Sequence, residues 1–361
     1  MRVAIVAHAF PPYVGGLSYV IENLSINLVK KGIEVEVVTL DPSERLPREE
    51  NYKSVIVKRF RGYAPSQAYF IASMECVNYL KKIDADVVHI HNVGSVLTLQ
   101  ALMTIRRRGG KPLVVISPHH HEGGSRWHTK IAWLFYKPLI RRALKRADRV
   151  HAVSDYEASL IRRDFHVEPI VIPNGVSEDV LSYRWDPPRD RVVATYAGRV
   201  ERYKRVDLAV KVLKGFQERI GRKAILRVIG EGGDLPRVLG VARRSGVEVE
   251  WHRFLPRERY LKLLSQSTVF INLSKYEAYS IVTAEALAIG VPAIIAEPWG
   301  NTFKHEEGVY IVEAEDLSTT VETLKKIANL DTNSLKPLKR ISRSLTWSQV
   351  TEHIVSKLYT P

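Results

Sequence analysis

Two glutamates in one strand–loop–helix segment have the residue type and spacing that most favour chemistry. Glu277 lies in the loop after the predicted strand 269–273, and Glu285 lies one to two turns into the following helix. Mostly helical rise between them separates the carboxylates by roughly 10 Å. This is too far for the paired acids of a hydrolase, but it suits two acceptors that grip different ends of a polyhydroxylated ligand. An unpaired carboxylate in an apolar helix is costly, so we expect Glu285 to bind a ligand.

A basic loop, Ala197–Lys204, follows the predicted strand 192–196. Within it, Arg199 and Lys204 flank a turn that leads into a helix. Two cations beside a helix N-terminus suit a diphosphate, because side chains and backbone N–H groups there both favour anions. The sequence therefore predicts a diphosphate site.

Three successive histidines, His119, His120 and His121, follow the fifth predicted strand. Imidazole ligates zinc, but adjacent residues of an extended chain point to opposite sides. All three therefore cannot easily share one ion. We expect a catalytic or polar contact by one or two of them, and solvated surface histidines are the alternative.

The loop 8–16 joins the first predicted strand to the first helix and ends in Gly15 and Gly16. Glycines there let a ligand approach the backbone, and the helix N-terminus favours anions. The dinucleotide fingerprint G-x-G-x-x-G is absent from this loop. An ordinary tight turn and a ligand-binding loop are equally good interpretations of this pair alone.

Alternating apolar strands and amphipathic helices must position these residues. The predicted first series has strands at 2–7, 35–40, 55–59, 87–91 and 113–117, with a helix over 17–31 between the first two. After a polar linker at 183–191, a second series has strands at 192–196, 224–229, 247–251, 269–273 and 293–296, separated by helices. Such βαβ repeats predict doubly wound parallel sheets, with ligands at the carboxyl ends of the strands and in a cleft between two domains.

The predicted domains are therefore an N-terminal Rossmann-like acceptor domain over 1–182 and a C-terminal Rossmann-like donor domain over 183–344. The tail 345–361 carries Trp347, Val350, Ile354 and Leu358 on one helical face. We expect this helix to return to the first domain.

Composition narrows the classes of partner and compartment. The 361 residues include a single cysteine, Cys76, which excludes an internal disulfide and cysteine-based zinc sites. Neither a signal peptide nor an apolar run of membrane-spanning length is present in the sequence, so we expect a cytoplasmic protein. The net charge is +15, which suggests an anionic partner: nucleic acid, a membrane surface or a phosphorylated substrate.

Taken together, the motifs resemble a retaining glycosyltransferase of the GT-B fold, family four. The resemblance runs from end to end and includes PPYVGG, VVHIHN, the histidine loop, VSDYE, IPNGV, AGRVERYK, VIGEG and the segment from Glu277 through Glu285 to GVP. It implies transfer of a hexose from a UDP- or GDP-sugar to a hydroxyl acceptor, a glycan or a lipid-linked molecule. It also implies that no metal and no cofactor take part.

The resemblance also implies roles for individual residues. Arg199 and Lys204 match the basic pair that contacts the donor diphosphate, Glu285 the acid that binds the ribose, and Glu277 the acid near the sugar hydroxyls. His119 matches the catalytic histidine, with His120 and His121 as alternatives in register. Further donor-binding positions are Gly15, Gly16, His120, Gly198, Gly230, Arg253, Phe254, Ser280, Ile281 and Val282.

Two departures from the family pattern affect donor choice. Tyr279 and Ser280 stand where the family usually has Phe-Gly, and Arg253 stands at a usual glycine, where the nucleotide base would stack. The identities of the base and of the sugar therefore stay open. The triplet Asp84-Ala85-Asp86 resembles the metal motif of the other glycosyltransferase fold, but it precedes a strand, so we interpret it as a helix end.

The excess charge is concentrated in residues 102–149, which hold 12 lysines and arginines against two acids, interleaved with aromatics. This stretch suits the anionic inner surface of a membrane, with peripheral attachment, or else a core with a solvated basic face. Nucleic-acid binding is a distant alternative because no nucleic-acid motif is present. A nucleotide-sugar epimerase of the same fold is the other alternative; it would not need an acceptor to release nucleotide.

Overall fold

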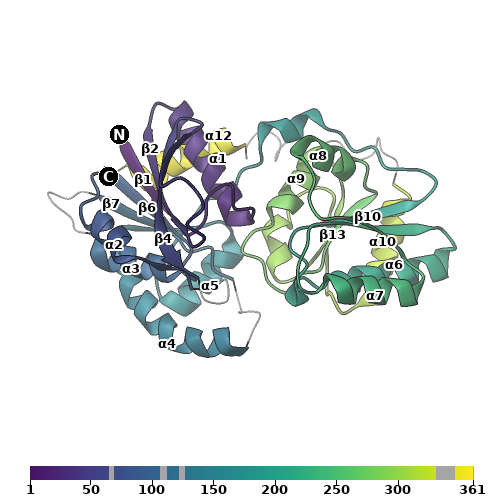
Figure 1. The fold of residues 1–361 in the computed structure, drawn as a ribbon. Coiled ribbons are helices and arrows are strands. Elements are labelled where there is room, and N and C mark those ends of the chain that lie inside the picture. Colours follow the sequence, from purple (N-terminus) through teal and green to yellow (C-terminus); the bar gives the residue numbers. More distant parts are fainter. Residues whose placement is uncertain (65–68, 106–111, 122–126, 331–345, 361) are drawn as a thin grey trace. The chain divides into compact units, whose positions relative to one another are not determined.

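The computed structural model describes residues 1–64, 69–105, 112–121, 127–330 and 346–360 (Figure 1). Its contacts divide the chain into two compact units. The first unit consists of Met1–Gly175 and Trp347–Pro361, and the second consists of Val176–Thr346. Each unit has its own buried apolar core.

The first unit is built on a sheet with strand order β3-β4-β2-β1-β6-β7-β8-β9, and β5 pairs with β4. Only β3 and β5 run antiparallel to their partner among the described strands. The chain adds strands on one side of β1 and then returns to place β6 on the other, which makes a switch point between β1 and β6. The bounds are β1 (Arg2–Val6), β2 (Glu34–Asp41), β3 (Glu49–Tyr52), β4 (Val55–Tyr63), β5 (Ile71–Ala72), β6 (Val87–His91), β7 (Leu113–Ser117), β8 (Arg149–Ala152) and β9 (Ile170–Val171).

Helices cover both faces of this sheet. The helices that share the buried apolar cluster of this unit are α2 (Met74–Lys81), α3 (Val96–Thr104), α4 (Trp127–Leu144) and α5 (Asp155–Phe165). The helices of the other face are α1 (Gly16–Lys30) and α12 (Trp347–Ile354), which lie side by side (Figure 1). A π-helical turn, η5 (Val355–Tyr359), continues α12.

The second unit has six parallel strands in the order β12-β11-β10-β13-β14-β15. This is the strand order of a doubly wound Rossmann sheet, with its switch point between β10 and β13. The bounds are β10 (Val192–Ala197), β11 (Ala224–Ile229), β12 (Glu248–His252), β13 (Val269–Asn272), β14 (Ala293–Ala296) and β15 (Val309–Val312).

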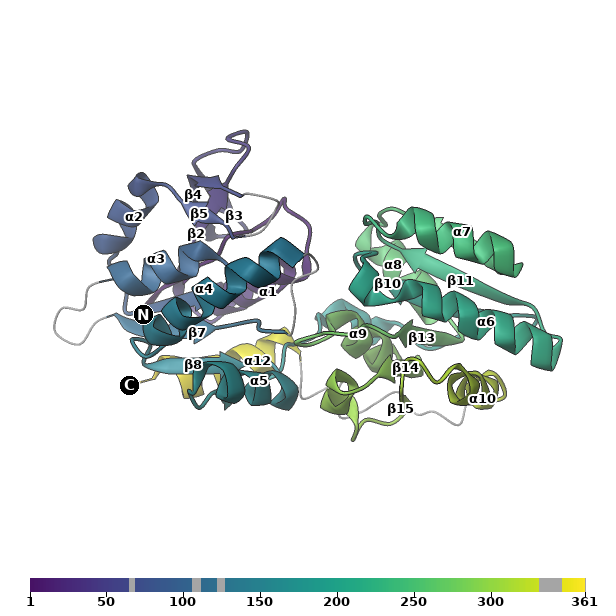
Figure 2. The same ribbon diagram turned by 90° about the horizontal axis from the view of Figure 1, so that it is seen from below.

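The helices of the second unit also lie on two faces of its sheet (Figure 2). One face carries α6 (Val206–Ile220), α7 (Leu235–Ser245) and α10 (Leu317–Ala328), which share the core cluster of this unit. The other elements are α8 (Arg257–Ser265), α9 (Ile281–Ile289) and the short 3-10 helices η2 (Glu178–Ser182), η3 (Arg202–Lys204) and η4 (Trp299–Phe303).

The predicted fold class is confirmed: two α/β units with doubly wound, largely parallel sheets. The return of the C-terminal helix to the first unit is also confirmed, because its predicted apolar face is buried there (Trp347, Val350, Ile354 and Leu358). The first predicted boundary, between 182 and 183, differs from the division after Gly175: η2 packs on α9, so it belongs to the second unit. The second predicted boundary, between 344 and 345, lies outside the described residues.

Candidate active site

The loops after β10 and β13 meet at the switch point of the second sheet. The two strands are adjacent and parallel, so their carboxyl ends share the edge at which open α/β sheets bind ligands. Arg199 and Lys204 follow β10, and Glu277 follows β13. The structure therefore brings these three predicted residues to one edge.

Lys204 and Glu277 form a largely buried ion pair. Lys204 Nζ lies 2.6 Å from Glu277 Oε1, and the two side chains are only 13% and 15% exposed. Asn272 Nδ2 and Ser274 Oγ donate to the same oxygen over 3.3 and 3.0 Å. The ammonium is thus fixed in place, and its charge is compensated in the absence of an anionic ligand.

Arg199 lies at an exposed position of the same loop. Its Nη2 donates to the hydroxyl of Tyr203 over 3.3 Å, and the hydroxyl of Tyr196 donates to the Arg199 carbonyl over 2.7 Å. The backbone of the loop is therefore anchored to β10, and the guanidinium stays near the surface. The two predicted cations follow the same strand, one buried and one exposed.

Two glycines bring the loops after β10 and β11 into close contact. Gly230 has φ +135°, and a Cβ on it would stand 2.1 Å from the carbonyl oxygen of Gly198. The N–H of Gly198 in turn donates to the carbonyl of Ile229 over 2.9 Å. A residue with a side chain at 230 would have to displace backbone. Both predicted glycines therefore shape the ligand-binding edge of the sheet.

The predicted donor-binding residues after Glu277 begin α9. Ser280 accepts a hydrogen bond from the N–H of Thr283 and caps the helix. Ile281 and Val282 form the first turn and are half-buried. The N-terminus of α9 is therefore directed to the same edge as the end of β13.

Glu285 lies one turn further along α9 and is buried, with its side chain 3% exposed. Two residues of α8 donate to its carboxylate: Arg257 Nη1 to Oε1 over 2.6 Å and Tyr260 Oη to Oε2 over 2.7 Å. Arg257 also binds both carboxylate oxygens of Asp179 in η2, over 2.9 and 3.0 Å. We predicted that Glu285 binds a ligand, but the sequence did not indicate that Arg257 and Tyr260 donate to its carboxylate.

The loop after β12 carries the residues predicted to contact the nucleotide base. Phe254 is 68% exposed, and Arg253 forms an exposed ion pair with Glu231 at 2.7 Å. Trp251 Nε1 donates to the carbonyl of Gly230 over 2.8 Å. Exposed aromatic rings next to the loop after β11 are suited to stack on a planar base.

In the first unit, Gly15 caps α1 and Gly16 is its first residue. A Cβ built on either glycine would meet no described atom within 4 Å, so packing within the described protein does not require glycine there. The loop itself is held firmly, because Tyr13 Oη donates to Asp41 Oδ1 over 2.6 Å and Arg59 Nη2 donates to the carbonyl of Pro11 over 2.8 Å. This combination of a fixed backbone and open space favours the ligand-loop interpretation.

His119 directly follows the short loop after β7 and has φ +49°, a left-handed conformation that non-glycine residues rarely adopt. Its Nε2 lies 3.0 Å from Nδ1 of His91, the last residue of β6. Burial, aided by nearby histidines, lowers the pKa of His119 to about 3. The imidazole is therefore neutral near pH 7 and contributes hydrogen bonds, not charge.

His120 is held inside the first unit. Its Nε2 lies 2.8 Å from Asp164 Oδ2, and its backbone N–H donates to Glu157 Oε1 over 2.6 Å. Its ring stacks on Trp133 and packs at a tilt against Phe165. These contacts argue against the predicted donor contact of His120, because its ring is already bound and buried. The three histidines do have different surroundings, as alternation predicted: the ring of His119 meets His91, and His121 is exposed.

A second group of histidines forms a chain of hydrogen bonds through the sheet. His151 Nε2 contacts the carbonyl of Ile172, Ser117 Oγ contacts His151 Nδ1 and His89 Nε2, and Tyr359 Oη contacts His89 Nδ1, each over 2.7 Å. Because a carbonyl only accepts, neutral His151 must carry its proton on Nε2. It then accepts from Ser117, which accepts from His89, which accepts from Tyr359. The C-terminal turn η5 is thereby hydrogen-bonded into the interior of the first unit.

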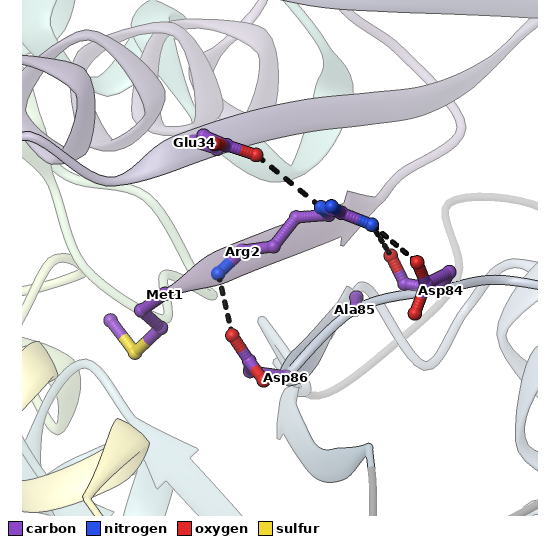
Figure 3. Close-up of a pocket in the computed structure, with 6 residues that line it drawn as sticks. All are labelled: Met1, Arg2, Glu34, Asp84, Ala85 and Asp86. Atoms are coloured by element: carbon purple, nitrogen blue, oxygen red, sulfur yellow. Dashed lines mark hydrogen bonds and ion pairs between the residues drawn. The ribbon is translucent and has the colours of Figure 1, made fainter.

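The Asp84-Ala85-Asp86 triplet lies at the opposite, amino-terminal end of the first sheet (Figure 3). Arg2 pairs with Glu34 and Asp84, and its N–H donates to Asp86 over 2.8 Å. The triplet precedes β6, as expected, and its acids have protein partners. No group of three or more metal-ligating side chains was found among the described residues.

Sequence reasoning missed several residues that organise these sites. Glu157 is fully buried, with its pKa raised to about 7 by burial, and accepts from the N–H groups of His120 and Val153. The S-x-x-E spacing of Ser154 and Glu157 is a capping-box pattern that could have drawn attention to it. For Arg257 there was no such pattern, because its partners Asp179 and Glu285 are far away in the sequence.

Family models match nearly the whole chain. The model described as glycosyltransferase family 4 matches residues 14–180, and the model described as glycosyl transferases group 1 matches residues 181–343. Their junction, between residues 180 and 181, falls within η2.

Relatives and solved structures agree with this match. A GDP-mannose:cellobiosyl-diphosphopolyprenol alpha-mannosyltransferase of Xanthomonas oryzae pv. oryzae is 26% identical, over 99% of this chain and 97% of its own. A GDP-mannose-dependent alpha-mannosyltransferase of Mycobacterium tuberculosis is 26% identical, over 83% and 80%. The sucrose-phosphate synthase structure from Thermosynechococcus elongatus superposes with a TM-score of 0.78 at 18% identity, over 98% and 97%, which shows the same fold.

Proposed function

The chain belongs to the family 4, group 1 glycosyltransferases, and on that premise we propose that it moves a hexose from a nucleoside-diphosphate sugar to a lipid-linked acceptor. The transfer retains the configuration of the sugar and needs no metal. The observation that carries the proposal is the meeting of Arg199, Lys204 and Glu277 at the switch point of the second sheet.

The donor diphosphate lies at the ends of β10 and β13 in this proposal. The bond between C1 of the sugar and the diphosphate oxygen breaks, a bond from the acceptor oxygen to C1 forms, and the acceptor proton leaves with the diphosphate. Arg199 and Lys204 stabilise the negative charge that develops on the leaving group. Glu277 holds sugar hydroxyls, and His119, being neutral, provides a hydrogen bond to the substrate.

GDP-mannose is the first donor to test. The two relatives described above carry GDP-mannose in their names. An exposed aromatic loop at Trp251 and Phe254 offers stacking surface for a base. UDP-glucose is the matched alternative, since stacking alone does not select between bases.

The outer side of α4 supports a lipid-linked acceptor. Ile131, Leu134, Phe135 and Leu139 recur at helical spacing and are 48–76% exposed. Arg141, Arg142, Lys145 and Arg146 follow and are also exposed. We propose that this apolar and basic face rests on an anionic membrane. No described helix has the length and apolarity of a membrane span, and residues 106–111 and 122–126 of the predicted basic stretch lie outside the described residues.

Sugar transfer tests the proposal directly. The protein is incubated with GDP-mannose or UDP-glucose and a short oligosaccharide on polyprenyl diphosphate, with and without EDTA. We expect an α-linked product, unchanged by EDTA, and release of nucleoside diphosphate only when acceptor is present. Failure to transfer sugar from either donor contradicts the proposed pair of substrates. Inversion of configuration at the sugar contradicts the retaining mechanism. Release of nucleoside diphosphate without acceptor favours an epimerase.

Vesicle flotation tests the membrane contact. The wild type should float with vesicles that contain phosphatidylglycerol and much less with phosphatidylcholine alone. A variant with Leu134→Ser and Phe135→Ser should lose flotation, because the two most exposed apolar side chains of α4 no longer enter the lipid. Ile220→Ser, on an exposed site of α6, is the matched control. Equal flotation of all three proteins contradicts the role of α4.

A further inference from the structure

Glu285 is closed off by a cation of its own unit. Its side chain is 3% exposed, whereas that of Arg257, which covers it, is 34% exposed. The guanidinium donates to Glu285 through Nη1 and to the two carboxylate oxygens of Asp179 through Nε and Nη2. A ligand hydroxyl can reach the Glu285 carboxylate only if something moves, and Arg257 is the side chain on the solvent side.

Resting on the proposed donor site, we propose that Arg257 is a specificity residue: it caps Glu285 and yields only to the vicinal hydroxyls of a ribose. When the ribose arrives, Nη1 leaves Glu285, and the two bonds to Asp179 keep the guanidinium charge compensated. Ligands without these hydroxyls, such as pyrophosphate or a 2′,3′-dideoxynucleotide, cannot donate hydrogen bonds to Glu285 in place of Arg257. They therefore leave the cap closed.

The geometry keeps the free-energy cost of this exchange of hydrogen bonds small. Arg–carboxylate pairs are strong when two parallel bonds form, and Arg257 makes two such bonds with Asp179. Tyr260 keeps its bond to the other oxygen of Glu285, which holds the carboxylate in orientation while Nη1 moves. A carboxylate left buried and bare would be costly, but here one partner is exchanged for another.

If Arg257 covers Glu285 in this way, replacing Arg257 should strengthen nucleotide binding. Arg257→Ala removes a competitor of the ribose, so the affinity for GDP should rise by about tenfold, as expected for loss of one competing charge-assisted hydrogen bond. The affinity for pyrophosphate, which does not reach Glu285, should be unchanged. An ordinary structural or phosphate-binding arginine would give the opposite result, weaker binding of both ligands.

Titration calorimetry with GDP, 2′,3′-dideoxy-GDP and pyrophosphate tests this, with UDP in place of GDP if UDP-glucose is the working donor. Arg259→Ala is the matched control: it removes the same charge from an exposed position of α8 and should change no affinity. Asp179→Asn weakens the two bonds between Arg257 and residue 179. Arg257 should then bind Glu285 more strongly, and the affinity for GDP should fall.

GDP binding to Arg257→Ala that is unchanged or weaker overturns the cap. Equal binding of GDP and dideoxy-GDP by the wild type also overturns it, because the ribose then does not meet Glu285. Thermal unfolding checks that each variant is folded. If Arg257→Ala proves unstable, Arg257→Lys replaces it in the test. Because lysine cannot form two parallel bonds with a carboxylate, we expect this variant to bind GDP more tightly than the wild type, by a smaller factor than the alanine variant would. Sugar transfer by the wild type is measured separately. Binding results that contradict the role of Arg257 therefore leave the proposed function unaffected, whereas the absence of transfer by the wild type contradicts that function.

Discussion

The ion pair between Lys204 and Glu277 permits a test that separates stability from catalysis. Removing one partner of a fully buried pair costs about 3–5 kcal/mol. These side chains are 13% and 15% exposed, and Asn272 and Ser274 still donate to Glu277. We therefore expect Lys204→Met or Glu277→Gln to destabilise the second unit by about 2–3 kcal/mol. For a unit of this size, that lowers its unfolding temperature by about 4–10 °C.

The double variant discriminates between the two roles of Lys204. Replacing both charges by neutral side chains of similar volume should recover about 1–2 kcal/mol of stability, because no buried charge is left alone. Sugar transfer should not recover: Lys204→Met and the double variant should both be slower by about 100- to 1000-fold, the value of one fixed charge on a leaving group.

Scanning calorimetry and initial rates of transfer are the measurements. Lys275→Met, an exposed lysine beside Ser274, is the control for loss of one charge and should match the wild type in both. If the double variant regains transfer together with stability, Lys204 acts only by pairing with Glu277, and its proposed contact with the diphosphate is wrong.

Three further outcomes are expected. His120→Phe keeps the packed ring but removes the bond to Asp164, so thermal unfolding should show a loss of about 1–3 kcal/mol; an unchanged midpoint would contradict the structural role. Gly230→Ala forces a Cβ against the Gly198 carbonyl, so nucleotide binding, measured by calorimetry, should be lost or greatly weakened, and near-normal affinity would show that the loops need not touch. The pKa of His151 is lowered to about 4 by burial, so below pH 6.5 the unfolded state binds its proton first and stability is lost down to about pH 4, by up to about 3 kcal/mol. Burial lowers the pKa of His8 to about 4 and that of His119 to about 3 in the same way, whereas the pKa of Glu157, raised to about 7, offsets the effect of about one histidine over this range. A stability that does not fall between pH 6.5 and 4.5 would therefore contradict the burial of these neutral histidines.

Regular elements were predictable where the pattern was local. The strands β6, β7, β11 and β14 have the predicted bounds, because apolar runs and flanking breakers define them within a few residues. The helices α2 and α3 were not predicted. They are short, and α3 is apolar on nearly all sides, so no helical period stands out.

Site residues were predictable as positions but not as contacts. The loop after each strand indicated Lys204 and Glu277, yet their pairing depends on β10 lying beside β13, which sequence periodicity does not reveal. Alternation separated His119 from His120, but it could not tell which one faces the interior. The positive φ of His119 and the distant Asp164 decide that.

The second unit is one continuous segment of chain, whereas the first is completed by a segment that is synthesised after the whole of the second. Trp347 and Tyr359 are buried in the first unit, and Tyr359 ends its chain of buried hydrogen bonds. During synthesis, residues 176–346 are all available before Tyr359 leaves the ribosome. The first unit therefore completes its folding after the second unit has been synthesised. A truncation that removes Tyr359 would leave buried His89, 270 residues upstream, without the hydroxyl that contacts its Nδ1.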